Sequence, residues 1–189
     1  MSFEINERGY WVGENKHHTD KGLKSALCEF VSEQSSLVDF GCGDASYAKE
    51  IAQNGLDVEA YDGNPVVVSQ TNGFAKVLDL SEPFDLERKF DVVMSLEVAE
   101  HLPKKYEEVY VDNLIKHTNG WLIISWAVPG QGGKGHFNEQ PEEYVLKLFE
   151  NKGFSHKDEY SKYLRNSITN LSWFKNTIFV FNKDGVTNG

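Results

Sequence analysis

Short apolar runs alternate with sets of apolar residues at helical spacing along most of the chain. Runs at residues 37–40, 56–61, 74–78, 91–96 and 121–127 have the length and composition of buried strands. Between and around them, apolar positions three or four residues apart predict helices over 20–34, 46–54, 65–70, 103–117 and 141–151. A strand at 154–160, a short helix near 161–167 and a strand at 176–182 complete the pattern. The alternation predicts an α/β fold, a sheet with helices on both faces.

Capping and turn residues set the expected ends of these elements. Thr19 or Asp20 can cap the first helix, and Gly55 ends the second. The pair Asn119-Gly120 predicts a turn before the strand at 121–127. Ligands of such folds lie beyond the carboxyl ends of the strands, so the loops there are where chemistry is expected.

The first of these loops is a glycine turn between the strand at 37–40 and the following helix. Its spacing does not fit a dinucleotide site, because the sixth position of that motif is occupied by Ser46, and it lacks the lysine of a P-loop. The pattern present is D-x-G-x-G-x-A, formed by Asp39, Gly41, Gly43 and Ala45. Taken alone, this stretch is equally consistent with an ordinary turn between strand and helix.

Two acidic residues follow at the ends of the next strands. Asp62 comes 19 residues after Gly43, and a carboxylate at that place can accept hydrogen bonds from two ribose hydroxyls. The sequence Asp62-Gly63-Asn64-Pro65 is also a turn signal in its own right. Asp79 can accept a hydrogen bond from a base amino group, or it can cap a helix over residues 82–88.

Composition limits the partners and the compartment. The 189 residues suit one domain, and no apolar run approaches the roughly 20 residues of a membrane span. A net charge of −10 repels phosphate backbones, so extended nucleic acid is an unfavourable partner. Cys28 and Cys42 do not indicate a disulfide framework, and no secretion signal is evident, so a cytoplasmic location is expected.

Three segments are expected. Residues 1–18 form a polar N-terminal arm, 19–182 form the domain, and 183–189 form a flexible tail. The arm carries Tyr10 and Trp11, which either anchor it on the body or close over a ligand as a lid. The sequence leaves the oligomeric state open.

Taken together, the motifs resemble those of the class I S-adenosylmethionine-dependent methyltransferases. The resemblance covers about residues 20–182 and rests on the glycine turn, Asp62, Asp79 and residues 91–101. It implies a Rossmann-like fold with a seven-stranded, mostly parallel sheet. It also implies a set of cofactor-binding residues, namely Trp11, Asp39, Gly41, Cys42, Gly43, Asp62, Gly63, Asn64, Asp79, Leu80, Ser95 and Leu96.

The segment after the strand at 91–96 resembles the E-x-x-E-H motif of ubiquinone-pathway O-methyltransferases and small-RNA 2′-O-methyltransferases, and not the Asn-Pro-Pro-Tyr motif of amino-group methylases. By that resemblance Glu97, Glu100, His101 and His136 bind Mg²⁺ or Mn²⁺, and His136, His101 and Glu97 are the catalytic groups. Positions 97, 100 and 101 point one way if the segment forms a helical turn. Without metal, Glu97 touches the cofactor, Glu100 caps a helix, His101 packs, and His136 acts alone as the base.

The acceptor is the least defined part. The loop at 126–138 and the end of the chain resemble methyltransferase domains of polysaccharide-building systems, which implies a sugar or glycan hydroxyl. Trp126, Tyr10 and Trp11 could then stack on a sugar ring. The alternatives are a quinone-type phenol, a terminal RNA 2′-hydroxyl, which the net acidity disfavours, and a non-catalytic cofactor-binding subunit.

Overall fold

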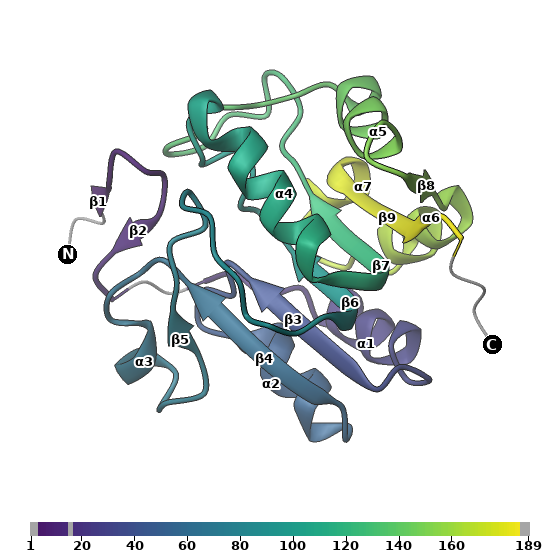
Figure 1. Ribbon diagram of the computed structural model, residues 1–189, viewed down its shortest axis with the longest axis horizontal. Coiled ribbons are helices and arrows are strands. Elements are labelled where there is room, and N and C mark those ends of the chain that lie inside the picture. Colours follow the sequence, from purple (N-terminus) through teal and green to yellow (C-terminus); the bar gives the residue numbers. More distant parts are fainter. Residues whose placement is uncertain (1–3, 15–16, 186–189) are drawn as a thin grey trace.

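The computed structural model describes residues 4–14 and 17–185 and is built on one central sheet (Figure 1). Its seven strands run in the order β5-β4-β3-β6-β7-β9-β8. The strands β5 to β7 are parallel, and β9 is antiparallel to both of its neighbours. Their bounds are β3 Ser36–Phe40, β4 Asp57–Asp62, β5 Lys76–Val77, β6 Phe90–Ser95, β7 Thr118–Ser125, β8 Phe154–His156 and β9 Ile178–Lys183. The predicted fold class is confirmed.

Helices cover both faces of this sheet, with α4 in front and α1 and α2 behind it in Figure 1. The helices are α1 Lys21–Phe30, α2 Ser46–Gln53, α3 Val67–Gln70, α4 Glu107–His117, α5 Glu142–Glu150, α6 Asp158–Asn166 and α7 Phe174–Thr177. A short 3₁₀ helix, η1 Lys104–Tyr106, precedes α4. None of the helices in the described ranges is long and apolar enough to cross a bilayer.

The two larger clusters of the core lie on opposite faces of the sheet, because neighbouring residues of a strand point to opposite faces. Val38, Val93 and Leu122 lie in the cluster under α4 and α5. Their neighbours Leu37, Val92 and Ile123 lie in the cluster under α1 and α6. Burial on both faces explains why these strands read as continuous apolar runs in the sequence.

Four details of the predicted elements are wrong. Residues 82–88 form no helix, since Glu87 has a positive φ of 54°, which lies outside the right-handed helical region. The pair Asn119-Gly120 lies inside β7, where a side chain at 120 would press on the carbonyl of Asp91. The helix α1 ends at Phe30 and not near residue 34, and the strand predicted at 154–160 ends at His156, because α6 begins at Asp158. The four-residue helix α7 was not predicted, because Phe174 is its one large apolar residue.

The structure describes parts of both predicted terminal segments. A two-stranded hairpin, β1 Glu4–Ile5 and β2 Trp11–Val12, forms the arm and pairs antiparallel. The strand β9 extends to Lys183, so the predicted tail begins one residue later than expected. The rest of that tail, 186–189, and residues 1–3 and 15–16 of the arm lie outside the described residues.

Candidate functional site

The glycine turn between β3 and α2 brings the backbone close to other segments. Gly41 and Gly43 have positive φ values of 83° and 56°, and the N–H groups of Gly41 and Cys42 donate to the carbonyl of Tyr61. A side chain at position 41 would come within 2.2 Å of a methyl group of Val98. The turn therefore requires glycine for both conformation and space.

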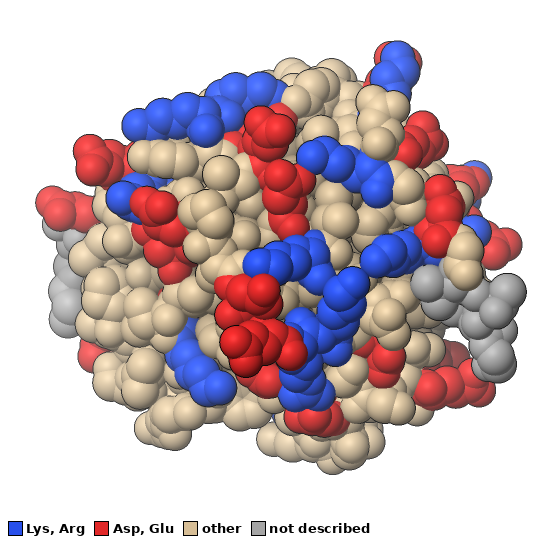
Figure 2. Space-filling view, in the orientation of Figure 1, with Lys and Arg blue, Asp and Glu red and all other residues tan. Residues whose placement is uncertain are grey.

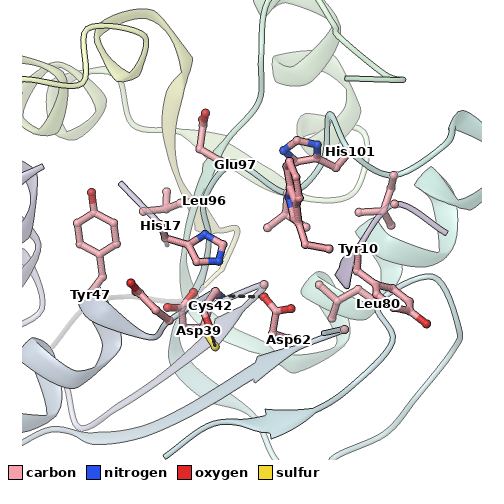
Figure 3. A pocket seen from close by; sticks show the side chains of 18 of the residues that line it. Tyr10, His17, Asp39, Cys42, Tyr47, Asp62, Leu80, Leu96, Glu97 and His101 are labelled. Atoms are coloured by element: carbon pink, nitrogen blue, oxygen red, sulfur yellow. Dashed lines mark hydrogen bonds between the residues drawn. The ribbon is translucent and has the colours of Figure 1, made fainter. Parts of the chain in front are cut away.

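A cavity of about 380 Å³ opens over this turn, beyond the carboxyl ends of the parallel strands (Figure 3). In Figure 3, Tyr47 and Tyr10 lie at opposite ends of it, with Asp39, Cys42 and Asp62 between them. The predicted residues that line it are Trp11, Asp39, Gly41, Cys42, Gly43, Asp62, Gly63, Asp79, Leu80, Leu96, Glu97 and His101. The structure thus brings together residues from five separate loops.

Four predicted site residues lie behind the walls of this cavity. Asn64 is buried, and its side chain bonds to the backbone N–H and carbonyl of Gly13. Ser95 is buried and donates to the carbonyl of Phe40. Glu100 and His136 lie in a neighbouring cluster described below. Asn64 and Ser95 hold the N-terminal arm and β6 in place.

Several lining residues had no signal in the sequence analysis. They come from the N-terminal segment before α1, the start of α2, the loop after β6 and the segment before β9, and they are Arg8, His17, His18, Thr19, Ser46, Tyr47, Val98, Trp173 and Phe174. Their positions depend on long-range contacts, which a local motif does not encode. The aromatic residues Trp173 and Phe174 were the strongest available hint.

The centre of the cavity is rich in acidic groups. Asp62 accepts hydrogen bonds of 2.8 Å from the N–H groups of Gly43 and Asn64, and burial raises its pKa. Asp39 is 3% exposed, and burial, together with Asp62 and Asp44, raises its pKa to about 8. A positively charged ligand would relieve this crowding of carboxylates.

Asp79 lies at the end of the cavity covered by the N-terminal hairpin. Its carboxylate accepts from the hydroxyl of Ser81 and pairs with the guanidinium of Arg8 at 3.0 Å. The ring of Tyr10 packs directly on Gly63. The arm therefore packs on the body and lines one end of the cavity, and its role as a lid stays a prediction.

Glu97 has an unusual backbone conformation that decides where its side chain points. Its φ is +56°, and its N–H and carboxylate both bond to the hydroxyl of Ser125. Burial raises its pKa to about 7, and the bond to Ser125 opposes that rise. The predicted helical turn over 97–101 is wrong, because a left-handed residue at 97 interrupts it.

The other three members of the predicted metal set do come together. Glu100, His101 and His136 each offer a ligand atom, and these atoms lie within 4.8 Å of one another. Glu97 lies outside this group. Both carboxylate oxygens of Glu100 are buried, and neither has a hydrogen-bond partner among the described residues. Burial and the charge of Glu97 raise the pKa of Glu100 well above its usual range.

The two histidines have defined tautomers. His101 Nδ1 lies 3.0 Å from the carbonyl oxygen of Gly135, which can only accept, so Nδ1 carries the proton. His136 Nδ1 lies 3.1 Å from Glu139. In the neutral form of each ring, Nε2 is then the nitrogen that keeps a lone pair. Burial lowers the pKa of His101 to about 4, so this ring is neutral at pH 7.

One predicted acceptor contact is wrong. The ring of Trp126 is fully buried, and its N–H donates to the carbonyl of Asn138 at 2.6 Å. It cannot stack on an acceptor. Trp11, by contrast, lines the cavity and packs edge-on against His101, with ring centres 5.7 Å apart.

Comparison with known proteins identifies the family. Residues 16–159 match the profile of the family described as methyltransferase domain. The chain therefore belongs to the class I S-adenosylmethionine-dependent methyltransferases. Its fold is similar to that of magnesium protoporphyrin IX methyltransferase from Synechocystis PCC 6803, solved with bound S-adenosylhomocysteine. The TM-score is 0.66 at 16% identity, over 90% of each chain.

Curated relatives of this methyltransferase are named ubiquinone biosynthesis O-methyltransferase. The protein from Rickettsia conorii is 31% identical over 99 residues, which are 47% of this chain and 34% of the relative. The protein from Rickettsia typhi is 30% identical over 143 residues, which are 65% of this chain and 57% of the relative. The chain thus matches between about a third and just over half the length of these relatives.

Proposed function

We propose that this methyltransferase transfers the methyl group of S-adenosylmethionine to a hydroxyl oxygen of a small acceptor. The observation that carries this proposal is the cluster of Glu100, His101 and His136 beside the cofactor cavity, next to the buried carboxylate of Glu97. S-Adenosylmethionine supplies a methyl carbon that is already electrophilic. The protein then has to orient a hydroxyl and remove its proton.

The acidic centre of the cavity suits this cofactor. Asp62 is placed to accept hydrogen bonds from the ribose hydroxyls, and Asp79 and Leu80 lie where the base would bind. Asp39 is buried beside Asp62, and the positive charges of the methionine part favour its ionised form.

The cluster also fits a divalent cation. Glu100 has two buried carboxylate oxygens without hydrogen-bond partners among residues 4–14 and 17–185, and the neutral tautomer of each histidine leaves Nε2 available. Imidazole and carboxylate together suit Mn²⁺ or Mg²⁺. Glu100, His101 and His136 would hold the ion, which would lower the pKa of a bound hydroxyl. Partners such as Gly135 and Glu139 fix the ring orientations.

Glu97 is the best placed proton acceptor of the chain itself. Its Oε1 accepts from Ser125, which leaves Oε2 to take the proton of the acceptor hydroxyl. It lines the cavity together with His101. A carboxylate with a pKa of about 7 is matched to proton transfer near neutral pH.

A phenolic hydroxyl is the acceptor that the observations favour. The relatives from Rickettsia are named for ubiquinone biosynthesis, and the lining of the cavity includes aromatic residues of the arm and the C-terminal segment. The predicted sugar or glycan acceptor has less support, because Trp126 is buried and cannot contact it. A sugar is therefore the contrast in the experiment below.

The surface charge supports a small acceptor over nucleic acid. On the face shown in Figure 2, basic side chains are interspersed with acidic ones and form no continuous stripe. Arg88, for example, pairs with both Asp57 and Glu59. Together with the net charge of −10, this arrangement disfavours a phosphate backbone.

Calorimetric titration with S-adenosylhomocysteine tests the cofactor first. Turnover of S-adenosylmethionine is then measured with catechol and with methyl glucoside, each with Mn²⁺ and with a chelator. We expect micromolar product binding, methylation of catechol, and loss of turnover in the chelator that Mn²⁺ restores. Full activity in the chelator would show that the reaction needs no metal ion. Methylation of the glucoside alone would replace the phenol by a sugar, and absence of product binding would overturn the proposal as a whole.

A further inference from the structure

The glycine turn uses its own N–H groups inside the protein. Those of Gly41 and Cys42 donate to the carbonyl of Tyr61, and that of Gly43 donates to the carboxylate of Asp62 at 2.8 Å. These bonds shape the turn, but they also mean that these three N–H groups are not available to an anionic group of a ligand.

The start of α2 is occupied in a similar way. The N–H of Ala45 donates to the carbonyl of Cys42, and the N–H of Ser46 donates to the carboxylate of Asp44 at 3.0 Å. The N-terminus of a helix is a favourable place for an anion, but here a carboxylate of the chain itself lies there. An anionic ligand group over this turn therefore needs a donor from a side chain.

S-Adenosylmethionine carries such a group, because its methionine part ends in a carboxylate as well as an ammonium group. With the base at Asp79 and the ribose at Asp62, the methionine part extends towards the end of the cavity near Tyr47 (Figure 3). Asp39 and Asp44 also line the cavity, and like charges repel a further carboxylate. Without a specific partner, this end would disfavour the carboxylate of the cofactor.

His17 places a donor at this end. Its ring packs on the backbone of Gly43, where a side chain at position 43 would come within 2.8 Å of the ring. The half-buried His17 lines the cavity, and Figure 3 shows its ring between Tyr47 and Asp62. Burial raises the pKa of Asp62, and the nearby His17 is among the groups that oppose this rise. An imidazole has at least one N–H to donate, whether it is neutral or protonated.

Other polar side chains near this end are less suited to the carboxylate. The hydroxyls of Thr19 and Ser46 lie 2.8 Å apart and bond to each other. His18 is exposed. The hydroxyl of Tyr47 accepts from the backbone N–H of Asp20 and can still donate its own proton, so Tyr47 is the rival that an experiment has to separate from His17.

We propose that His17 binds the carboxylate of the methionine part of S-adenosylmethionine through a hydrogen bond from its imidazole. The segment before α1 thus supplies a cofactor ligand, and His17 is the residue that selects adenosyl compounds with a carboxylate over those without one. The inference rests on the cofactor site of the proposed function and does not depend on the acceptor.

Two ligands that differ by the carboxylate test this proposal. The affinities of S-adenosylhomocysteine and of decarboxylated S-adenosylhomocysteine are measured by calorimetry, without turnover. We expect the wild type to bind S-adenosylhomocysteine at least about tenfold more tightly, because a hydrogen bond to a charged group outweighs the repulsion by the acidic lining.

His17→Phe keeps a ring on Gly43 but removes the donor. It should abolish the preference or reverse it, and should change the affinity for the decarboxylated ligand less than about twofold. His17→Gln, whose amide can donate, should restore part of the preference. An equal loss of both ligands in His17→Phe would show a packing role only and would overturn the proposal.

The neighbouring side chains give the matched comparison. His18→Phe and Tyr47→Phe should both keep the preference for S-adenosylhomocysteine. A preference that survives in His17→Phe, or that is lost in one of these two variants instead, overturns the assignment to His17. Equal affinity of the wild type for both ligands overturns the inference alone, whereas absence of binding of either ligand overturns the cofactor site and the inference with it. A preference without methylation of any acceptor would count against the proposed reaction and not against His17.

Discussion

The Nδ1 atom of His136 lies 3.1 Å from Oε1 of Glu139, and this contact fixes the tautomer of the histidine. Glu139 is itself held by hydrogen bonds of 2.7 and 2.8 Å from the N–H groups of Gly130 and Gly132. These bonds outweigh the effect of burial and lower the pKa of Glu139. An ionised Glu139 therefore keeps the proton of His136 on Nδ1 and leaves Nε2 as the atom that can bind a metal.

Replacing this carboxylate should weaken metal binding specifically. We expect Glu139→Ala to lower the affinity for Mn²⁺ roughly 10- to 100-fold, as removal of such a partner commonly does, and Glu139→Gln to restore part of it. Calorimetry with Mn²⁺ and with S-adenosylhomocysteine separates the two sites, and the second affinity should not change. Glu143→Ala, an exposed change in the first turn of α5, is the control. Equal Mn²⁺ affinity in Glu139→Ala would exclude the positioning role.

Replacing His136 should reduce turnover but leave cofactor binding almost unchanged. His136→Ala should reduce kcat at least about 10- to 100-fold, since it removes one ligand of the proposed metal site. It should leave the affinity for S-adenosylhomocysteine within about threefold, because His136 lies outside the cavity lining. Steady-state kinetics and calorimetry on one preparation give both values. An active variant would remove His136 from the reaction.

Replacing Asp62 should instead weaken cofactor binding itself. Its carboxylate bridges the N–H groups of Gly43 and Asn64 and borders the cavity. Asp62→Ala removes the group that would accept the ribose hydroxyls and also loosens the glycine turn. We expect a loss of S-adenosylhomocysteine affinity of at least about 100-fold, corresponding to roughly 3 kcal/mol. Near-normal affinity would mean that the ribose binds elsewhere.

The pKa of Asp39 predicts that cofactor binding depends on pH. Burial, with Asp62 and Asp44, raises this pKa to about 8, so the free protein holds a proton there at pH 7. Positive charge on S-adenosylmethionine favours the ionised form, so binding should release this proton and tighten as pH rises towards 8. Calorimetry in two buffers of different ionisation enthalpy counts the protons. The release should shrink in Asp39→Asn, and an unchanged release would assign it to another group.

The sequence predicted those elements and site residues that depend on the local pattern of apolar and polar positions. Residues 37–40 and 91–96 are largely apolar because both faces of their strands are buried. The sequence therefore predicted both strands and the glycine turn that follows the first of them. The carboxyl ends of parallel strands lie at the same edge of the sheet, whatever their order in the sequence. This rule predicted that Asp39, Asp62 and Asp79 lie close together, and all three line the cavity.

The rest depended on contacts that no local pattern records. Glu97 left the predicted metal set because Ser125, 28 residues away, holds it in a left-handed conformation. Trp126 looked like a stacking residue but is fully buried, whereas Trp173 reaches the cavity because Asp20 holds the loop before it. In each case a partner distant in sequence decided where the side chain lies.

Asp20 carries the last prediction, on stability. It caps α1 and joins it to the loop at 169–171, with backbone N–H donors on four residues, namely Leu23, Thr169, Asn170 and Leu171. Burial alone would raise the pKa of Asp20, but these bonds outweigh it and hold the pKa far below its usual range. In Asp20→Asn an amide faces these donors, and we expect a loss of about 2–4 kcal/mol in the free energy of unfolding.

The pH dependence of the free energy of unfolding tests whether the charge of Asp20 is responsible for this stability. Because the folded pKa of Asp20 is depressed, its contribution is fully present above its unfolded pKa of about 3.9 and is lost as the pH falls towards the folded value. Urea unfolding should therefore show a constant difference between wild type and Asp20→Asn from about pH 5 to 8 and a smaller one near pH 3. Asp85→Asn, which removes an exposed partner of Lys116, should change the free energy of unfolding much less than Asp20→Asn. A difference between wild type and Asp20→Asn that stayed constant down to pH 3 would mean that shape, and not charge, makes Asp20 important.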